Sequence, residues 1–189
     1  MAEQPNWVLA ELPPKYADLA KQIAALMEQA REYESLAGAL WQTGAPLTNA
    51  VAAVFRSLQC QTEMMDNGAN YDVRAQLEGK QRFLVHVVGA PEPLDRRSPE
   101  ISRILRTLQE DADEQDRVLL ALNIAYDQPP ASRKVELATQ EALRLIQGLG
   151  ANLVPTSTLF GLWKYSLHDA TSAKKSLLRL HELKGGIFR

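Results

Sequence analysis

The segment Arg82-Phe-Leu-Val-His-Val-Val-Gly89 constrains the fold of this chain more than any other stretch. It is a short apolar run, rich in β-branched residues and closed by a glycine, which is typical of a buried strand. Because side chains alternate across a strand, Leu84, His86 and Val88 should share one face of it. The polar residue among them, His86, is therefore the first candidate for a functional role.

Two more short runs precede this segment and have the same period. Residues 60–65 and 71–77 also have the pattern of strands, and the intervening sequences Asp66-Asn-Gly68 and Glu78-Gly-Lys80 favour tight turns. The three runs therefore predict an antiparallel meander. A single acid, Asp72, lies near the start of its middle strand.

The remainder of the chain alternates helical and strand patterns. Residues 117–123 are almost continuously apolar, as expected of a central strand, which should run beside the third strand of the meander. Five acids between Glu110 and Asp116 predict an exposed link before it. Capping residues, prolines and glycines predict these further elements: a helix over 46–58, a helix capped by Ser98 with Pro99 first, a helix over 132–148, a strand over 152–155, a helix from Thr156, a helix from the Asp169 cap to Leu183, and an edge strand over 185–189. The order predicts an α/β fold with a mixed sheet flanked by helices.

The first part of the chain has a different periodicity. After Pro13-Pro14, apolar residues alternate spacings of three and four to about Gln42, which is the a/d seam of a coiled coil. The seam residues are Tyr16, Leu19, Ile23, Leu26, Ala30, Tyr33, Ala37 and Leu40. Such a helix buries its stripe either against a second copy or on its own domain, and we favour pairing into a homodimer. With Gly44 as a helix stop, the sequence predicts a helical segment over 1–43 and an α/β domain over 44–189.

Composition excludes several classes of protein. The net charge of −2 provides no global basic field that would attract nucleic acid or a membrane surface. The one cysteine, Cys60, excludes an internal disulfide and fits a reducing compartment. The N-terminus lacks the basic and apolar regions of a secretory signal, and the longest uncharged stretch, 145–163, contains three glycines and a proline. We therefore expect a cytoplasmic protein with no membrane partner.

The sequence has an acid on one predicted strand and, on the next strand, a polar residue and its i+2 neighbour on the same face. This arrangement resembles the PD-(D/E)xK layout of the restriction-endonuclease-like nucleases. The similarity is closest to bacterial members whose core follows a long helix ending in a Leu-(Leu/Trp)-x-x-Gly turn. It covers roughly residues 40–189 and rests on order and spacing, with these matching segments: Leu40-Trp-Gln-Thr-Gly44, Asn123 at a strand end, Pro129-Pro-Ala-Ser-Arg133, and Val154-Pro-Thr-Ser-Thr-Leu-Phe160. The resemblance implies a restriction-endonuclease-like α/β domain.

The resemblance also assigns the positions of an active site. In this class two carboxylates hold Mg²⁺, and a lysine orients or deprotonates the attacking water. The first acid falls at Asp72, the second at His86 and the lysine at Val88. Valine can neither hold a water nor donate a proton, and imidazole suits transition metals better than Mg²⁺. The resemblance therefore implies a catalytically inactive relative without a cofactor, acting as a nucleic-acid-binding or protein-interaction module.

An alternative keeps the catalytic interpretation open. It is a metal-dependent nuclease with an altered divalent-metal site built on Asp72 and His86, for which Glu100 is the remaining candidate carboxylate. The simpler interpretation of His86, a core histidine bonded to a backbone carbonyl, is favoured over a metal ligand. Asp72 fits a turn-proximal surface acid about as well as it fits the role that the family would give it.

Local basic patches are the candidate contacts for nucleic acid. One surrounds the start of a predicted helix and consists of Arg96, Arg97, Arg103 and Arg106. The C-terminal part of the chain is basic as well, and either region could contact phosphates. We favour the simpler interpretation, the positive half of a nearly neutral surface, because no aromatic residues are interleaved for base stacking. His168 and His181 have no partner at ligand spacing and are expected at the surface.

Overall fold

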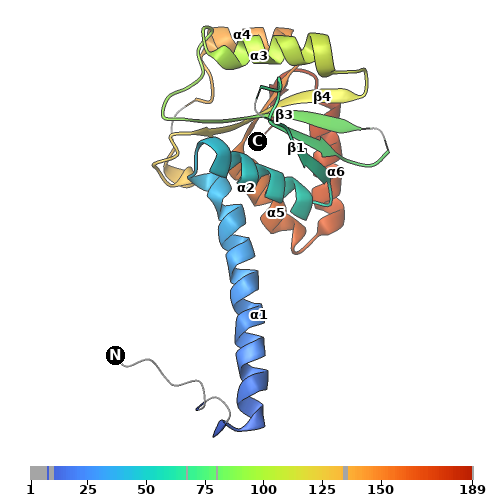
Figure 1. The fold of residues 1–189 in the computed structure, drawn as a ribbon. Coiled ribbons are helices and arrows are strands. Elements are labelled where there is room, and N and C mark those ends of the chain that lie inside the picture. Colours follow the sequence, from blue (N-terminus) through green and yellow to red (C-terminus); the bar gives the residue numbers. More distant parts are fainter. Residues whose placement is uncertain (1–7, 9–10, 67, 80, 134–135, 189) are drawn as a thin grey trace. The chain divides into compact units, whose positions relative to one another are not determined.

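The computed structural model describes residues 8, 11–66, 68–79, 81–133 and 136–188 (Figure 1). In this part of the chain, six strands form one mixed sheet in the order β1-β2-β3-β4-β5-β6. The pairs from β1 to β3 are antiparallel and those from β3 to β6 are parallel. The strands are β1 (Gln61–Met64), β2 (Val73–Gln76), β3 (Arg82–Ala90), β4 (Asp116–Ile124), β5 (Asn152–Pro155) and β6 (Gly186–Ile187). The predicted meander is confirmed, as is the strand predicted beside its third member.

Helices cover both faces of the sheet. α3 and α4 lie side by side on one face, and α2, α5 and α6 lie on the other (Figure 1). The helices are α1 (Pro14–Ala37), α2 (Gly44–Ser57), α3 (Pro99–Arg106), α4 (Gln140–Gly148), α5 (Thr156–Ser166) and α6 (Ala170–Glu182), with the short turns η2 (Gly38–Leu40), η3 (Thr107–Asp111) and η4 (Pro130–Ser132). The α/β class and the mixed sheet flanked by helices are therefore confirmed, whereas the restriction-endonuclease-like arrangement stays a prediction.

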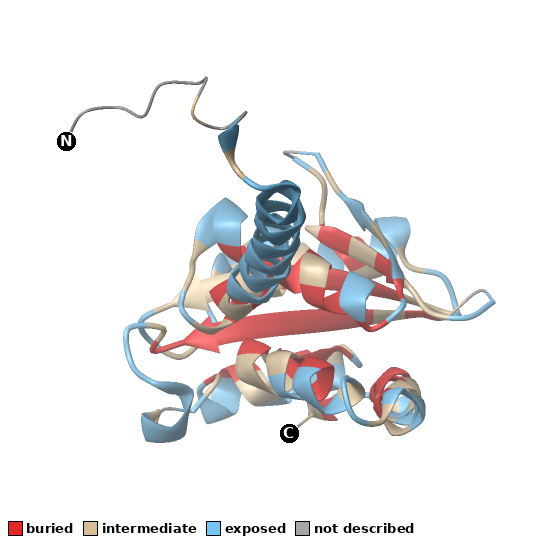
Figure 2. Cartoon of the chain, turned by 90° about the horizontal axis from the view of Figure 1, so that it is seen from below, coloured by how far each residue is buried: buried red, intermediate tan, exposed pale blue. Residues whose placement is uncertain are grey.

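β3 divides its side chains between two cores, as its alternation predicts. Phe83 and Val85 pack into the core formed with α2, α5 and α6, whereas Leu84 packs with Ile104 of α3 on the opposite face. Each large aliphatic side chain buried in this way contributes about 1.5–3 kcal/mol to the free energy of folding. β4 is buried along nearly its whole length, and Figure 2 shows the buried residues gathered in the strands and on the sheet-facing sides of the helices.

The start of α2 lies against the carboxyl end of β3. A Cβ added to Gly89 would lie 2.9 Å from Cγ2 and 3.1 Å from Cα of Thr43, so only glycine allows this approach. Gly44, with φ of +57°, begins α2. The preceding α-helix had been expected to reach about Gln42, but it ends at Ala37 and passes into η2.

The helix expected over 132–148 begins only at Gln140. The chain before it runs beside Leu94, whose N–H donates to the carbonyl of Leu137 at 3.1 Å and whose carbonyl accepts from the N–H of Thr139 at 2.8 Å. These two bonds hold the backbone extended, so a helix cannot start there. Thr139 then caps α4 by accepting from the N–H of Ala142.

Two further local expectations need correction. Ser98 precedes α3 with Pro99 in the first turn, but its hydroxyl makes no capping bond. It accepts instead from the N–H of Asp95 at 2.9 Å. Asp116, counted among the acids of an exposed link, is buried at the start of β4 and accepts from Nε and Nη2 of Arg82 at 2.6 and 2.9 Å. This bidentate ion pair explains why a carboxylate is tolerated there.

The chain divides into two compact units, Met1–Glu34 and Ser35–Arg189. Leu36 and Ala39, at the end of the N-terminal helical region, belong to the core of the second unit. Every residue from 14 to 35 is exposed. Within the described residues, no helix has the length and apolar character needed to cross a membrane.

Candidate functional site

Asp72 and His86 lie on the face of the sheet that α3 covers. The register of β2 and β3 places Asp72 beside the middle of β3, where its N–H donates to the carbonyl of Val85 at 2.9 Å. Its Oδ2 atom accepts from the N–H of Val87 at 2.7 Å. The charge of Asp72 raises the pKa of His86, so the two residues are close enough to interact electrostatically. The antiparallel pairing thus brings together the two residues singled out from the sequence.

The second carboxylate oxygen of Asp72 is held by an arginine from α3. Arg103 donates from Nη2 to Oδ1 of Asp72 at 2.9 Å. The side chains of Arg103 and Asp72 are 27% and 24% exposed, so this ion pair is largely withdrawn from water. Both oxygens of Asp72 are therefore engaged, one by a backbone N–H and one by a guanidinium.

His86 is fully buried, and its polar contact runs through Thr107. The Thr107 hydroxyl donates to the carbonyl of Asn70 at 3.2 Å and lies 3.2 Å from Nε2 of His86. When the hydroxyl donates to the Asn70 carbonyl it can only accept from His86, and in that arrangement Nε2 carries the proton of the imidazole. Nδ1 is then an unprotonated acceptor, and it is buried without a hydrogen-bond partner within the described residues.

Burial and the nearby Arg103 guanidinium lower the pKa of His86 to about 4, against the opposing effect of Asp72. The imidazole is therefore neutral at pH 7. Thr107 also begins the π-helical turn η3, and the side-chain amide of Asn70 donates to Glu110 and Asp111 in that turn at 2.9 and 2.8 Å. We call Asn70, Asp72, His86, Arg103 and Thr107 the Asp72 cluster. It couples the segment before β2 and the middle of β3 to α3 and the π-helical turn, through contacts that range from exposed at Asn70 to buried at His86.

The position that the resemblance assigns to a catalytic lysine contributes no polar group. Val88 is half-buried and packs against the core beneath α3 and α4. Glu100 lies in the first turn of α3 and is half-buried. Among the residues that the structure describes, no three His, Cys, Asp or Glu side chains gather in a group that could hold a metal ion. The local chemistry is that of a neutral imidazole and a carboxylate whose two oxygens are both hydrogen-bonded.

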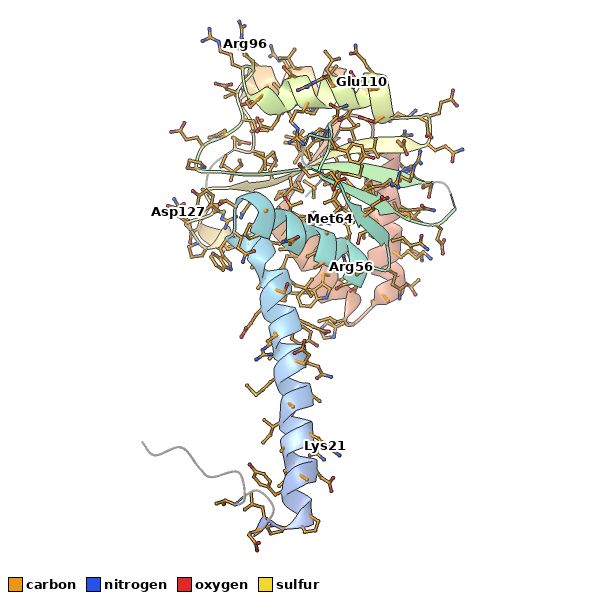
Figure 3. All side chains as sticks on the ribbon, viewed as in Figure 1. Lys21, Arg56, Met64, Arg96, Glu110 and Asp127 are labelled. Carbon is orange, nitrogen blue, oxygen red and sulfur yellow. The ribbon has the colours of Figure 1, made fainter. Side chains whose placement is uncertain are left out.

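The four candidate arginines differ in their surroundings. Arg103 is committed to Asp72, and Nη1 of Arg96 lies 3.8 Å from Oε2 of Glu141 on α4. Arg97 and Arg106 are exposed. Figure 3 shows Arg96 and Glu110 at opposite ends of the layer that contains α3. The structure thus brings one of the four into the Asp72 cluster and leaves the others on the surface.

A second polar cluster joins three segments singled out by the resemblance. Arg133 donates from Nη1 to Oδ1 of Asn123 at 2.7 Å, from Nε to the carbonyl of Gln128 at 2.9 Å, and from Nη2 to the carbonyl of Leu40. Asn123, fully buried near the end of β4, donates to the carbonyl of Gln42 at 2.9 Å. We call these residues the Asn123 cluster. It ties the turn after α1 and the segment before α4 to the centre of the sheet.

A shallow depression of about 620 Å³ lies beside the Asn123 cluster. It is lined by Trp41, Gln42, Thr43, Pro46, Tyr126 and Asp127. Trp41 is 62% exposed, which is unusual for so large an aromatic side chain. The indole is thus an accessible apolar surface next to a rigid polar network.

His181 is buried, contrary to the expectation that it lies at the surface. Its Nε2 is 2.9 Å from the carbonyl of Gln115, and its ring meets that of Phe83 edge to face at 5.4 Å. The repeat of Ala173, Leu177 and Leu180 along α6 places His181 next to a buried stripe, and this is the signal that could have identified it. His168 is exposed, as expected.

A comparison with protein-family models finds no match, and comparisons with curated proteins and with solved structures find none either.

Proposed function

We propose that this chain is a non-catalytic protein of restriction-endonuclease-like topology that works as a protein-interaction module and assembles through α1. The ion pair between Asp72 and Arg103 carries the proposal. In an intact site of this class the first carboxylate would face a divalent cation. Here a guanidinium supplies the positive charge from within the fold, and no cofactor is needed.

The remaining residues of the Asp72 cluster support the same conclusion. Arg103 and the Val87 N–H each hold one oxygen of Asp72, and a metal that displaced Arg103 would leave a partly buried guanidinium without its counter-ion. Nε2 of His86 is bonded to the Thr107 hydroxyl, and Nδ1 is buried without a partner within the part of the chain that the structure describes. Val88 offers no group to activate water. The alternative of an altered metal site built on Asp72 and His86 therefore requires several contacts to be rearranged at once.

Charge favours a protein partner over nucleic acid. The net charge is −2, Arg103 is neutralised by Asp72, and Arg96 lies near Glu141. In the arginine patch this leaves Arg97 and Arg106, a small basis for phosphate contacts because nucleic-acid affinity rises with the number of phosphates neutralised. The basic C-terminal region keeps four exposed cations, Lys164, Lys175, Arg179 and Lys184, so any binding of nucleic acid is expected there. Binding of short duplex and single-stranded oligonucleotides, followed by fluorescence anisotropy at low salt, tests this choice. We expect no saturable binding at micromolar protein.

A cleavage assay tests the catalytic part of the proposal. Purified protein incubated with Mg²⁺ or Mn²⁺ should not cleave double- or single-stranded DNA or RNA above background. Asp72→Ala is the matched control, because a contaminating nuclease would be unaffected by it. Cleavage by the wild type that Asp72→Ala abolishes would establish the altered-metal nuclease instead.

A complementary variant restores the missing groups. His86→Glu combined with Val88→Lys and Arg103→Ala recreates two carboxylates and a lysine and removes the competing cation. We expect tighter Mn²⁺ binding by calorimetry than in the wild type, at a stability cost of several kcal/mol, because new charges enter a buried face. Circular dichroism in the same buffer confirms that the variant is folded.

The assembly part of the proposal rests on the exposed face of α1. Its large apolar side chains are between 46% and 65% exposed, and they are Tyr16, Leu19, Ile23, Leu26, Met27 and Tyr33. Burying each of them contributes about 1.5–3 kcal/mol, enough in sum to offset the entropic cost of association. Ala37 and Leu40, the last residues of the predicted seam, lie in the second unit and are half-buried.

Light scattering tests this assembly. We expect the wild type to be a dimer, and Ile23→Asp combined with Leu26→Asp to be a monomer that retains the circular dichroism of the α/β domain. The exposed Lys21→Ala variant should remain dimeric. A wild type that is monomeric at high concentration would contradict the proposed assembly.

A further inference from the structure

Trp41 is carried by backbone that is fixed on both sides. The carbonyl of the preceding residue, Leu40, accepts from Arg133. The carbonyl of the following residue, Gln42, accepts from the side-chain amide of Asn123 at 2.9 Å. An indole that is 62% exposed is therefore held in place by bonds from within the fold. Tryptophan is enriched among the residues that dominate binding at protein interfaces, and a fixed backbone lowers the entropic cost of binding there.

A strained turn supplies a second wall of the depression beside Trp41. Ala125 has a φ of +51°, in the left-handed region that residues other than glycine rarely adopt. Its N–H donates to the carbonyl of Ala90 at 3.0 Å, and its carbonyl accepts from the N–H of Gln128 at 3.1 Å. Tyr126 and Asp127 are the two central residues of this turn, and both line the depression. Backbone strain of this kind is concentrated at functional sites.

Asp127 supplies the charge of the depression. It lies at the edge of the α/β unit beside the start of α2 (Figure 3). Its side chain is exposed, and it is the one charged group among the described residues that line the depression. Burial lowers the pKa of Arg133 and the charge of Asp127 opposes this effect, so the two groups interact.

The Arg133 guanidinium nevertheless leaves the Asp127 carboxylate open to a ligand. Its nitrogens donate to neutral acceptors, which are the Asn123 side chain and the carbonyls of Gln128 and Leu40. Within the part of the chain that the structure describes, Asp127 has neither a hydrogen bond nor an ion pair at its carboxylate. A carboxylate in contact with solvent thus lies in the same depression as an accessible indole.

Aromatic rings together with a carboxylate favour a cationic ligand. The face of an indole attracts a cation, and the carboxylate supplies the counter-charge. Among protein side chains arginine suits this pair best, because its guanidinium is planar, stacks on aromatic rings and binds a carboxylate with two parallel hydrogen bonds. A nucleic-acid base would also stack on Trp41, but Asp127 would repel its phosphates.

We propose that the depression lined by Trp41, Gln42, Thr43, Pro46, Tyr126 and Asp127, the Trp41 depression, binds an arginine side chain from an exposed segment of a partner protein. The guanidinium stacks on Trp41 and pairs with Asp127. The volume of about 620 Å³ lies within the range of about 300–1,000 Å³ that is usual for ligand sites. Because the depression is shallow, it suits a side chain that projects from a protein surface. This site rests on the interaction role proposed above and adds the chemistry of the partner.

Nuclear magnetic resonance of the full-length chain tests this site. The probe is the blocked tripeptide acetyl-Gly-Arg-Gly-amide, and its matched control contains citrulline, which has the shape of arginine without the charge. We expect the arginine peptide to shift the indole N–H resonance of Trp41 saturably at millimolar concentration. The citrulline peptide should bind about fivefold more weakly, because it loses the cation–π contact and the ion pair. Trp41→Leu identifies the resonance by removing it.

Variants separate the two contacts of the arginine. Asp127→Asn should weaken the arginine peptide about threefold and reduce the salt dependence of its binding. Trp41→Leu should abolish the shift of the Thr43 backbone amide. The control is Glu182→Gln, an exposed acid next to His181, which contacts the residue before β4. Asp127 follows the other end of that strand, about 30 Å away, so the control should bind as the wild type does.

Several results would overturn the arginine site. They are no saturable shift in the wild type, equal affinities for the arginine and citrulline peptides, and an unchanged affinity in Asp127→Asn. Each of these would leave the cleavage assay and the assembly through α1 untouched, so the proposed function would stand. Conversely, cleavage that Asp72→Ala abolishes would end the proposed function whatever the peptides do.

Two further measurements exclude other occupants of the Trp41 depression. A single-stranded oligonucleotide that shifts the Trp41 indole resonance saturably would show that the depression takes nucleic acid, and this would overturn a protein partner. Light scattering of Trp41→Leu should show the same oligomeric state as the wild type. A dimeric wild type that becomes monomeric in Trp41→Leu would show that a second copy covers the depression, which would overturn the arginine site as well.

Discussion

The Asp72 cluster and the Asn123 cluster lie in the same sheet but differ in how fully their polar atoms are hydrogen-bonded. In the Asn123 cluster an arginine and an amide connect segments that are far apart in the sequence, and both termini of the Asn123 amide are bonded. In the Asp72 cluster both carboxylate oxygens are hydrogen-bonded, but Nδ1 of His86 is buried without a partner among the described residues. The first cluster organises the fold, whereas the second occupies the positions where the resemblance places chemistry.

The residues that hold the fold together are therefore separate from the residues that catalysis would require. Arg133 and Asn123 fix the carboxyl end of β4 whatever stands at position 88. The sheet is therefore held together by residues other than Val88 and His86, which stand where the resemblance places a lysine and a carboxylate.

The largest effect is expected from breaking the Asn123 cluster. Arg133→Ala leaves Oδ1 of the buried Asn123 and the carbonyl of Leu40 without their donor, and unsatisfied buried acceptors of this kind are costly. We expect a loss of about 3 kcal/mol in the free energy of unfolding measured by urea denaturation. The exposed Arg97→Ala should change it by less than about 0.5 kcal/mol. Equal effects of the two substitutions would mean that the Asn123 cluster does not hold the fold together.

A smaller, pH-dependent effect is expected from His86. Its native pKa is about 4, below the unfolded value of about 6.5. Between these pH values the unfolded chain binds a proton at His86 that the native chain does not bind. The contribution of His86 to the free energy of unfolding is therefore fully present above pH 6.5 and falls as the pH is lowered toward 4. From pH 7 to pH 5 the His86 contribution is a loss of about 2 kcal/mol.

His86→Leu isolates this contribution. The pKa of His181 is also lowered by burial and acts in the same direction, so the variant should keep the part of the pH dependence that His181 causes. Nuclear magnetic resonance provides a direct measurement, since the His86 ring protons should not titrate above pH 5. A normal titration near pH 6.5 would mean that His86 is accessible, and the metal-site alternative would gain support.

Patterns within a single element predicted most of the fold. The alternation in β3, the turn sequences of the meander and the continuous apolar run of β4 are local signals, and the structure has the corresponding strands. The start of α4 was predicted wrongly because the bonds between Leu94 and the residues before α4 are tertiary. Propensity at residues 132–139 carries no information about them.

The candidate site was predictable only in part, for a related reason. Strand register follows from the turns, so Asp72 and His86 could be placed together from the sequence. The partner of Asp72 could not, because Arg103 lies 31 residues further along the chain, among several arginines with the same local pattern. The same holds for Asp116 and Arg82, which form a partly buried ion pair across neighbouring strands. Charges in a sequence do not reveal which of them meet.

The smallest expected effect concerns the ion pair that carries the functional proposal. A double-mutant cycle with Asp72→Asn and Arg103→Ala measures its coupling energy, and asparagine keeps an oxygen for the Val87 N–H. Because both side chains are about a quarter exposed, solvent screens the pair, and we expect a coupling of about 1 kcal/mol that falls as salt is added. A coupling near zero would mean that the ion pair adds no net stability, and it would then no longer support the proposal that Arg103 takes the place of a metal ion. The cleavage assay with Asp72→Ala remains the test of whether the chain is a nuclease.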